Sequence, residues 1–365
     1  MICGPLLLVP VSVDAAAPPG RPGFRLPRRV VVSLLGLALI GAGLVWGFSS
    51  HRGGPLVVYC APDAGIAATI LRDFEQSTGT PIDVRFATTG GNSPDLVAQI
   101  IDEAEAPQCD VFWNAEPLGM LELQERGMLL PYQGPGHARI PAAFKAADGS
   151  WTGFAARLRV IVANTARIGT TPPNLDALLP GSDRSKIGFA KPLRGSARTH
   201  YTALWQLWGA PRLQAWHHDW KEGGVRECDS NSEVRDLVAE GVCFAGYMDA
   251  GDFFAAKADG KPVAMHAARL ESGKTIVQPN TVAIIRGTKR KNAARKLVDF
   301  LLSAESELAL ARSTARLVPL GPVSAEQVPA EVRELVAWAR DGADLSALGA
   351  ARGECLAWLK SEYPP

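Results

Sequence analysis

The chain has 365 residues, of which 47% are hydrophobic and 21% are charged, and its formal net charge at pH 7 is +1. This length fits two domains better than one, and the hydrophobic content is ample for sizeable cores. A net charge near zero gives no global attraction to a polyanion, so we expect no nucleic-acid partner.

The N-terminal part of the chain contains a disorder-prone segment followed by an apolar run. Residues 1–29 are rich in proline, glycine and alanine, and we predict a disordered cytoplasmic segment. Residues 30–48, VVVSLLGLALIGAGLVWGF, carry no charge and follow Arg25, Arg28 and Arg29. At a helical rise of about 1.5 Å per residue, this run nearly spans the hydrocarbon core of a bilayer. Because arginines stay in the cytoplasm, we predict one transmembrane helix with the remaining chain on the extracytoplasmic face.

The apolar run has two interpretations. The apolar region of a signal peptide usually has about 7–15 residues and ends at a small-residue cleavage site. Residues 30–48 form a longer run that ends in LVWGF. This favours a retained anchor, with a cleaved signal, and secretion, as the alternative. A true start codon downstream of Met1 is a further alternative.

The first half of the extracytoplasmic part alternates between apolar strands and amphipathic helices. The predicted order is strand 56–60, helix 67–76, strand 82–87, helix 94–105, strand 110–113 and helix 116–127. Strands that alternate with helices in this way indicate a parallel sheet with helices on both faces. We therefore expect an α/β fold.

The pattern resumes in a second half. The predicted strands are 159–163, 186–189, 224–227, 242–248 and 281–285, and the predicted helices are 199–208, 211–220, 232–240, 292–302, 304–314 and two more in the tail. Two α/β halves joined by extended crossovers create a cleft between two lobes. Open α/β sheets bind ligands at the carboxyl ends of their strands, so the loops after the strands are the candidate site.

The six cysteines do not form a CxxC motif, so a zinc ribbon or a thioredoxin-like site has no support. An oxidising compartment permits disulfides. Cys228 and Cys243 are the best pair by position, and we expect a disulfide between them. Small buried thiols are the alternative interpretation.

Five sequence blocks resemble the periplasmic ferric-binding type of solute-binding protein, a component of ABC importers. They are VVYCAPD, PQCDVFWNAEPLGMLELQERGMLLPY, GFAARLRVIVAN, SKIGFAKPLRGSARTHYTALWQLWG and QPNTVAIIRGTKRKNAARKLVDFLLSAESELAL. The resemblance runs from about Leu56 to Leu320, in the order and spacing of the family. It implies the type 2 periplasmic-binding-protein fold, in which two lobes of mainly parallel sheet flanked by helices close on a ligand.

Each lobe of this fold is assembled from discontinuous segments. We expect residues 55–155 plus 262–315 in the first lobe. Residues 156–261 plus 316–365, which include the C-terminal helices, should form the second lobe.

The chain departs from the ferric-binding pattern at the metal ligands. The resemblance matches the adjacent tyrosines of ferric-binding members to Gly251 and Asp252, so the tyrosine pair is missing. It matches a first-lobe histidine ligand to Asp63, and an acidic ligand to Ala115 or Glu116. Losing two phenolate donors should greatly weaken ferric binding.

The segment GYMDAGD is more similar to a sister subgroup with an acidic loop. In that comparison Asp249 and Asp252 match two aspartates. Carboxylates bind hard cations, or they accept hydrogen bonds from ammonium and hydroxyl groups. Both residues are therefore candidate ligand contacts.

Other candidates suit an anion, because helix N-termini offer free N–H groups and a positive dipole end. The resemblance adds an arginine that contacts the accompanying anion in some members, and an Asn-Ser pair with a similar role. These anion-side candidates are Thr88, Thr89, Gly90, Ser93, Arg157, Ser196, Thr199, Asn231 and Ser232. For every candidate the alternative is structural: a helix cap, a turn or an internal ion pair.

The resemblance predicts an extracytoplasmic solute-binding component of an ABC importer, working as a monomer with a permease in the membrane. The cargo would be ferric iron with an anion, or a phosphate- or phosphonate-bearing compound, and no resident cofactor is expected. The alternatives are a membrane-tethered sensor or interaction module of the same fold, and an extracellular hydrolase. We expect no enzyme, because the sequence contains neither a G-x-S-x-G elbow nor an H-E-x-x-H motif.

Overall fold

The computed structural model describes residues 54–87, 93–168 and 184–364. They belong to a compact unit that runs from Gly53 to Pro365. The predicted cytoplasmic segment 1–29 and the apolar run 30–48 lie outside the described residues. Within the described ranges, no helix has the length and apolar character needed to cross a bilayer.

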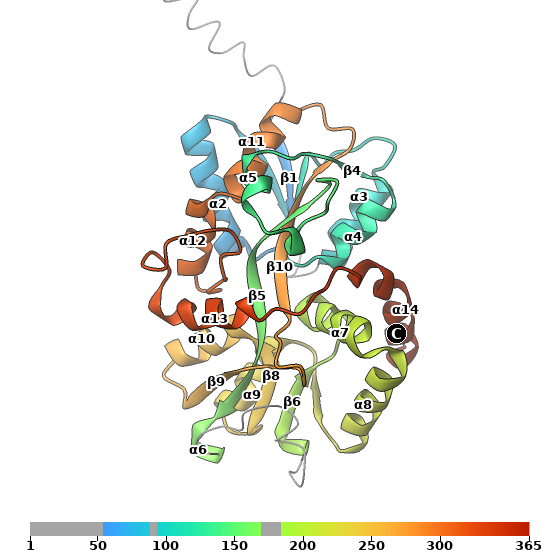
Figure 1. Ribbon diagram of the computed structural model, residues 1–365, viewed down its shortest axis with the longest axis vertical. Coiled ribbons are helices and arrows are strands. Elements are labelled where there is room, and N and C mark those ends of the chain that lie inside the picture. Colours follow the sequence, from blue (N-terminus) through green and yellow to red (C-terminus); the bar gives the residue numbers. More distant parts are fainter. Residues whose placement is uncertain (1–53, 88–92, 169–183, 365) are drawn as a thin grey trace, which may run out of the picture. The chain divides into compact units, whose positions relative to one another are not determined.

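The strands of the described chain join in one hydrogen-bonded sheet with the order β2-β1-β3-β10-β5-β8-β6-β7, while β4 pairs with β10 and β9 pairs with β5 (Figure 1). The strands are β1 (Leu56–Cys60), β2 (Ile82–Phe86), β3 (Val111–Asn114), β4 (Leu129–Leu130), β5 (Thr152–Asn164), β6 (Ile187–Ala190), β7 (Arg226–Cys228), β8 (Ala245–Asp249), β9 (Val263–Ala267) and β10 (Val277–Ile285). We call the half with β1 to β4 the first lobe and the half with β6 to β9 the second lobe.

The strands within each lobe are mainly parallel, as the alternation of strands and helices predicts. β1 pairs in parallel with β2 and β3, and β6 pairs in parallel with β7 and β8. The long strands β5 and β10 are antiparallel to each other and serve both lobes. The sheet is therefore mixed, which the sequence pattern did not indicate.

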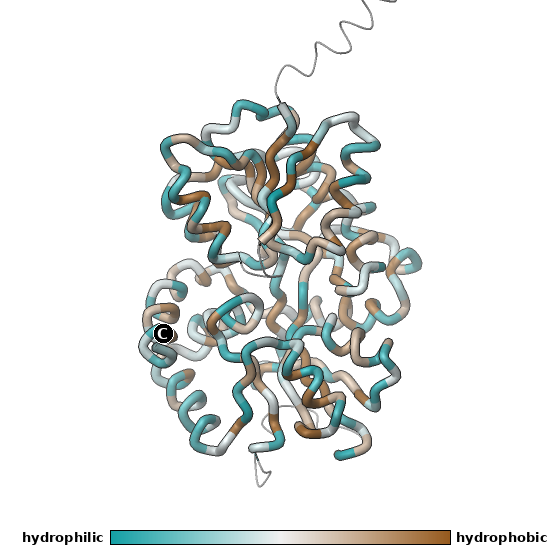
Figure 2. Tube along the Cα trace, turned by 180° about the vertical axis from the view of Figure 1, so that it is seen from behind, coloured by the Kyte–Doolittle hydropathy of each residue, from teal (hydrophilic) through white to brown (hydrophobic). Residues whose placement is uncertain are grey.

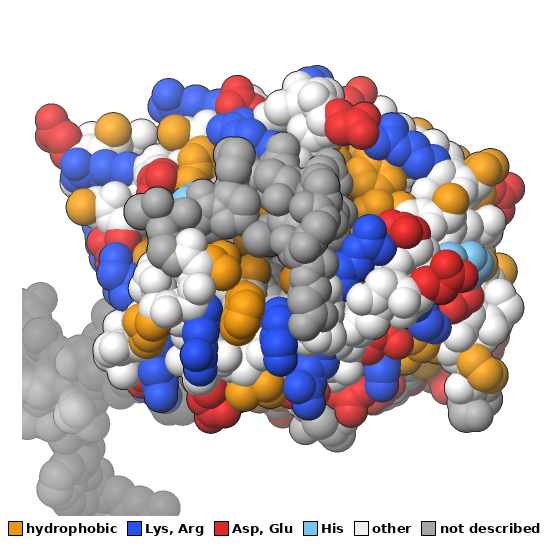
Figure 3. Space-filling model, turned by 90° about the horizontal axis from the view of Figure 1, so that it is seen from below, with side chains coloured by type: hydrophobic (Ala, Val, Ile, Leu, Met, Phe, Trp, Pro, Cys, Tyr) orange, Lys and Arg blue, Asp and Glu red, His pale blue; other side chains and the backbone are white. Residues whose placement is uncertain are grey.

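Helices cover the sheet, and most lie where the sequence predicts them. They are α2 (Ala64–Thr78), α3 (Ser93–Asp102), α4 (Leu118–Glu125), α5 (Pro135–Arg139), α6 (Thr165–Ile168), α7 (Gly195–Trp208), α8 (Ala210–Glu222), α9 (Asn231–Ala239), α10 (Ala250–Ala258), α11 (Lys291–Leu301), α12 (Ala304–Arg312), α13 (Ala330–Arg340) and α14 (Leu348–Glu362). Hydrophobic positions follow the interior strands and the inner sides of the helices in Figure 2. On the face shown in Figure 3, basic and acidic side chains are interspersed, in keeping with the small net charge.

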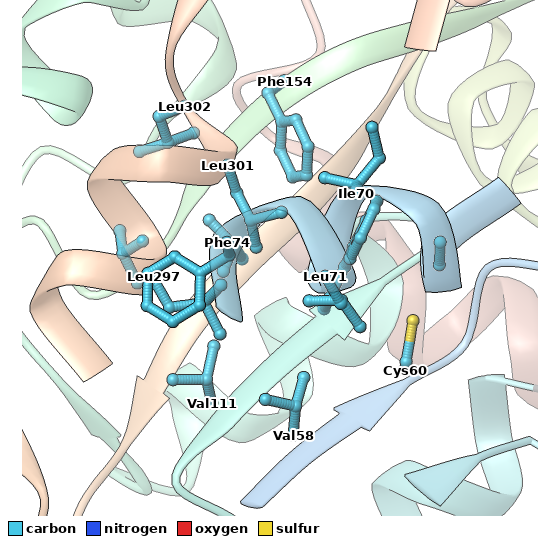
Figure 4. Close-up of a cluster of buried hydrophobic side chains, with 14 of the residues drawn as sticks. Val58, Cys60, Ile70, Leu71, Phe74, Val111, Phe154, Leu297, Leu301 and Leu302 are labelled. Atoms are coloured by element: carbon cyan, nitrogen blue, oxygen red, sulfur yellow. The ribbon is translucent and has the colours of Figure 1, made fainter. Parts of the chain in front are cut away.

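Each lobe has apolar cores on the two faces of its part of the sheet. In the first lobe, α2 and α11 pack on one face, where Phe74 and Leu71 meet Leu297 and Leu301 above Val111 (Figure 4). The opposite face carries a second cluster with Tyr59, Phe112 and Met120. This two-sided burial explains why the strands appear as continuous apolar runs rather than alternating ones.

The boundary between the lobes differs from the expected one at residue 262. β9 pairs with the Val160–Asn164 half of β5 and so belongs to the second lobe. The chain returns to the first lobe inside β10, whose last residues pair with β3. The reason is that β5 is one continuous strand of 13 residues, and its second half offers a free edge to β9. The C-terminal helices pack on the clusters of the second lobe.

The expected disulfide between Cys228 and Cys243 is not formed, and both are buried free thiols. The strand β6 lies between β7 and β8, so the two cysteines do not lie on neighbouring strands. Cys228 lies opposite Ala190 at the carboxyl end of β6, whereas Cys243 comes before β8 begins. The interpretation as small buried thiols is therefore the correct one.

Candidate ligand-binding cleft

A cavity of about 640 Å³ lies beside the carboxyl ends of strands from both lobes. Its walls are formed by the loops that follow β1, β3, β6, β7 and β8, together with one side chain of β5. The lining residues are Pro62, Asp63, Ala115, Glu116, Arg157, Ala190, Lys191, Arg194, Gly195, Ser196, Ala197, Asp229, Ser230, Asn231, Ser232, Asp249 and Asp252. The position agrees with the rule that α/β sheets bind ligands at these strand ends.

Most of the residues expected at a site from the sequence meet at this cavity. Those that line it are Asp63, Glu116, Arg157, Ser196, Asn231, Ser232, Asp249 and Asp252. Ser93 and Thr199 do not line it; their hydroxyls donate to the carboxylate of Glu116, at 3.1 and 2.9 Å. Thr88, Thr89 and Gly90 lie outside the described residues.

Arg159 organises the second-lobe wall, and the sequence argument missed it. Its Nη1 donates to the Oδ1 atoms of Asn231 and Asp249, both at 3.0 Å, and to Ser196 Oγ at 3.3 Å. Its Nη2 donates to the carbonyl of Tyr247, whose ring lies 4.9 Å from the guanidinium. The side chain is only 1% exposed. The sequence did carry a signal for this residue: an arginine next to the apolar residues of RVIVA is expected to be buried, and a buried charge needs polar partners.

Asp249 and Asp252 of the second-lobe wall already have ion-pair or hydrogen-bond partners within the protein. Asp249 forms an ion pair with Arg159, and its Oδ2 accepts from Asn231 Nδ2 at 3.3 Å. Asp252 accepts from the backbone N–H of Asp249 at 3.2 Å, at the first turn of α10. Burial raises the pKa of Asp252 to about 7, the charge of Asp249 adds to the rise, and Arg159 opposes it. The acidic loop thus neutralises an arginine and caps a helix.

The carboxylate of Glu116 also has hydrogen-bond donors within the protein. The residue is 2% exposed, and its carboxylate accepts from the backbone N–H groups of Leu118 and Gly119 at 2.8 and 3.2 Å. The hydroxyls of Ser93 and Thr199 and the guanidinium of Arg198 also contact it. It therefore has little capacity left to bind a cation.

Two cations at the cavity lack a carboxylate partner among the described residues. Arg157 Nη1 donates to the carbonyl of Ala115, and to Asn280 Oδ1 at 3.5 Å. Burial lowers the pKa of this guanidinium, and nearby acidic charges oppose the shift. Arg194 is exposed, and within the described part of the chain its side chain makes no hydrogen bond or ion pair, although, after Lys191, its charge helps to lower the pKa of Asp229. In contrast, Lys191 pairs with Asp229 at 2.8 Å.

The first turns of three helices also begin at the cavity wall. α7 begins at Gly195, whose φ of 57° favours glycine. α9 begins at Asn231, behind the cap formed by Ser230, and α10 begins at Ala250. Free N–H groups at the ends of α7 and α9 favour a bound anion, whereas the carboxylates of Asp249 and Asp252 already cap α10. Together with Arg157 and Arg194, they make this wall suited to negative charge.

The described residues show no preformed cluster of metal-ligating side chains at the cavity. In the described ranges, no group of three or more histidine, cysteine, aspartate or glutamate residues could hold a metal ion. No tyrosine is among the cavity-lining residues. The carboxylates present are paired with arginine or with helix N–H groups, as described above.

Residues 56–314 match the family described as bacterial extracellular solute-binding protein. The chain belongs to this family. Membership confirms the resemblance inferred from the five sequence blocks. The two-lobed α/β fold is the one expected.

The relatives include ferric-binding proteins. The major ferric iron-binding protein of Neisseria meningitidis serogroup B is 25% identical over 296 residues, which cover 75% of this chain and 87% of that protein. The Fe(3+)-binding periplasmic protein of Serratia marcescens is 27% identical over 165 residues, or 44% of this chain. The chain spans only 45% of the length of this second relative.

A solved structure shows the same fold. The periplasmic binding protein AfuA from Actinobacillus pleuropneumoniae, with exogenous fructose 6-phosphate bound, superposes with a TM-score of 0.69. Its sequence identity is 20%, and the match covers 84% of this chain and 98% of that chain. At this identity the likeness is one of fold.

Proposed function

We propose that this chain is the extracytoplasmic receptor of an ABC importer, and that it captures a small phosphate- or phosphonate-bearing solute between its lobes. The observation that carries the proposal is Arg157. This arginine contacts a backbone carbonyl and an amide oxygen at the cavity, but no carboxylate among the described residues. A cation withdrawn from water is unfavourable without a counter-charge. A bound anion supplies that charge.

The rest of the cavity supports an anion over a bare cation. Asp249 and Glu116 are already neutralised by Arg159 and by hydrogen-bond donors. The N-terminal turns of α7 and α9 add N–H groups. The AfuA structure holds a sugar phosphate in the same fold, which supports this ligand class.

Ferric iron together with an anion is the second candidate, because the curated relatives are ferric-binding proteins. In that case the anion would contact Arg157 and would also supply ligands to the metal. These relatives are binding proteins, which supports binding rather than catalysis. We further propose that a membrane permease receives the solute and that residues 30–48 anchor the protein to the cytoplasmic membrane.

A thermal-shift experiment on the full chain in mild detergent separates the two cargoes. The probes are fructose 6-phosphate, inorganic phosphate, an alkylphosphonate, ferric chloride, citrate and ferric citrate. A ligand at 100 times its dissociation constant adds about 2.7 kcal/mol to the stability of the folded state. We expect a phosphate- or phosphonate-bearing probe to raise the melting temperature. Stabilisation by a ferric probe, with no response to any iron-free phosphate or phosphonate, would overturn the phosphate proposal.

A further inference from the structure

Two side chains of the second lobe reach across to a buried carboxylate of the first lobe. Thr199 Oγ1, on α7, donates to Glu116 Oε2 at 2.9 Å. Arg198 Nη2, one residue earlier, lies 3.5 Å from Glu116 Oε1. Thr199 is fully buried and Glu116 is 2% exposed. This contact therefore excludes water, although it joins two lobes.

The first lobe holds its half of the contact in place by itself. Glu116 accepts from Leu118 N, Gly119 N and Ser93 Oγ, all of which belong to the first lobe. Its carboxylate thus has a fixed orientation whether or not the second lobe is near. A group oriented in advance loses little conformational entropy when its partner arrives.

A second polar contact lies beside the first. Arg352, on α14, donates from Nη1 to Glu122 at 3.1 Å and from Nη2 to Glu125 at 2.5 Å, both on α4 of the first lobe. Its side chain is 14% exposed. α14 belongs to the second lobe, since Cys355 and Leu359 pack in that lobe's core. The same α7–α14 side of the second lobe thus contacts the first lobe at two places, at Glu116 and on α4.

We propose that Glu116, Thr199, Arg198 and Arg352 form a polar latch that holds the two lobes together without a bound ligand. In the latched state Thr199 and Arg198 satisfy the Glu116 oxygens, and when the lobes separate water takes their place. The latch shifts the equilibrium between separated and joined lobes toward the joined state. The proposed ligand binds through the same lobe motion, so the latch sets the fraction of receptor whose lobes are separated and can close on cargo. Only the statement about cargo rests on the proposed function.

The latch is tested on the full chain without ligand, by measuring distances between spin labels on either side of the cavity. The labels replace two exposed residues, Thr69→Cys on α2 and Asp236→Cys on α9. Cys3 is changed to serine, and the described native cysteines are buried. The test variants are Thr199→Val, which removes only the hydroxyl donor, and Arg352→Met.

We expect both test variants to shift the distribution toward longer distances. The shift should be smaller for Arg352→Met, because its partners Glu122 and Glu125 are 28% and 52% exposed. For Thr199→Val the ratio of separated to joined lobes should rise about tenfold. A hydrogen bond to a charged group is worth at least that factor. Thr199→Ser restores the donor and should behave as the parent chain. The matched control is Arg126→Met, which removes a different arginine from the same Glu122 within α4.

Distances in folded Thr199→Val and Arg352→Met chains that equal those of Arg126→Met would overturn the proposal. Circular dichroism melting identifies folded variants. If Thr199→Val does not fold, Arg352→Met decides alone, because it leaves the buried Glu116 contacts intact. Because no ligand is present, a failed latch leaves the phosphate proposal standing, and the reverse also holds.

Discussion

Arg157 and Arg159 lie two positions apart on β5 and therefore point to the same side of the strand. Their surroundings give them different roles. Arg159 has the carboxylate of Asp249 as a counter-charge, and its guanidinium organises Asn231 and Ser196. Arg157 faces the cavity without such a partner among the described residues. Arg159 thus holds the second-lobe wall together, whereas Arg157 is available to bind an anion.

Arg157→Met should weaken binding of the phosphate-bearing probe that gives the largest thermal shift. Truncating a desolvated charged contact costs about 2 kcal/mol or more, which is about thirtyfold in affinity. Calorimetry measures the change, and urea unfolding should show a fold of similar stability. The control is Arg72→Met, at an exposed position of α2 outside the cavity. An affinity equal to that of the control would remove Arg157 from the site.

Asp252 should make anion binding depend on pH. Burial raises the pKa of Asp252 to about 7, helped by Asp249 and opposed by Arg159 and Arg235. Below this pH the carboxyl is neutral, whereas above it a negative charge at the cavity repels an anionic ligand. Affinity should therefore fall as the pH rises through about 7, after correction for titration of the probe itself. Asp252→Asn should give a flatter profile, and identical profiles for the two chains would contradict the assignment.

The same pKa fixes the sign of the effect on stability. An aspartate in an unfolded chain has a pKa of about 3.9. Between about pH 4 and pH 7 the folded state holds a proton that the unfolded state has released, so stability declines across this window as the pH rises. The loss from this group ends above its folded pKa of about 7.

At the scale of elements, the strands β5 and β10 connect the two lobes, and their pairing is irregular near the middle of the paired stretch. Their pairing register shifts between Pro279 and Asn280. Opposite this point, Ala155 has a φ of 42°, which is uncommon for a residue other than glycine. Glu307 of α12 holds this bend, because its buried carboxylate accepts from the backbone N–H of Ala155 at 2.9 Å.

The same carboxylate ties further segments to the crossover. It accepts from the backbone N–H of Leu320 at 2.8 Å and pairs with Arg139 at 2.5 Å. Glu307 thus joins α12, β5, the segment at residue 320 and the end of α5. We expect this junction to define where the lobes pivot.

Glu307→Ala should destabilise the fold by about 3–5 kcal/mol, because breaking a buried ion pair leaves its partners unsatisfied. The free energy of unfolding in urea measures the loss. Glu305→Ala, at an exposed position of the same helix, should change stability far less. Equal stabilities of the two variants would show that Glu307 does not support the crossover.

At the scale of the whole molecule, the sequence predicts which side of the membrane the lobes occupy. Arginines before residues 30–48 should stay in the cytoplasm. A phosphatase reporter that is active only outside the cytoplasm, fused after Pro365, should be active. A chain without residues 1–48 is the control and should leave the reporter inactive. Activity only from a cytoplasmic reporter on the intact chain would contradict the predicted orientation.

The local sequence pattern determined the fold class of this protein and the region of the sheet where its cavity lies. The alternation of apolar strands and amphipathic helices predicted the α/β lobes and the strand ends at which the cavity lies. The loops that contain Asp63, Ser196, Asn231 and Asp252 were predicted in this way, because loops after parallel strands meet at one edge of a sheet; the family resemblance then singled out Asp63, Asn231 and Asp252. Such patterns report which face of each segment is apolar, and that is a property of the local sequence.

The tertiary structure alone decided which side chains pair. It placed Arg159 against Asp249, a pairing across 90 positions that supplies the counter-charge of the buried arginine. It inserted β6 between β7, which ends at Cys228, and β8, which begins after Cys243, and the two thiols stay free. It also gave Glu116 donors from α7, 83 positions away. The physical reason is that partners of buried polar groups are set by long-range strand order and register, on which a local hydrophobic period carries no information.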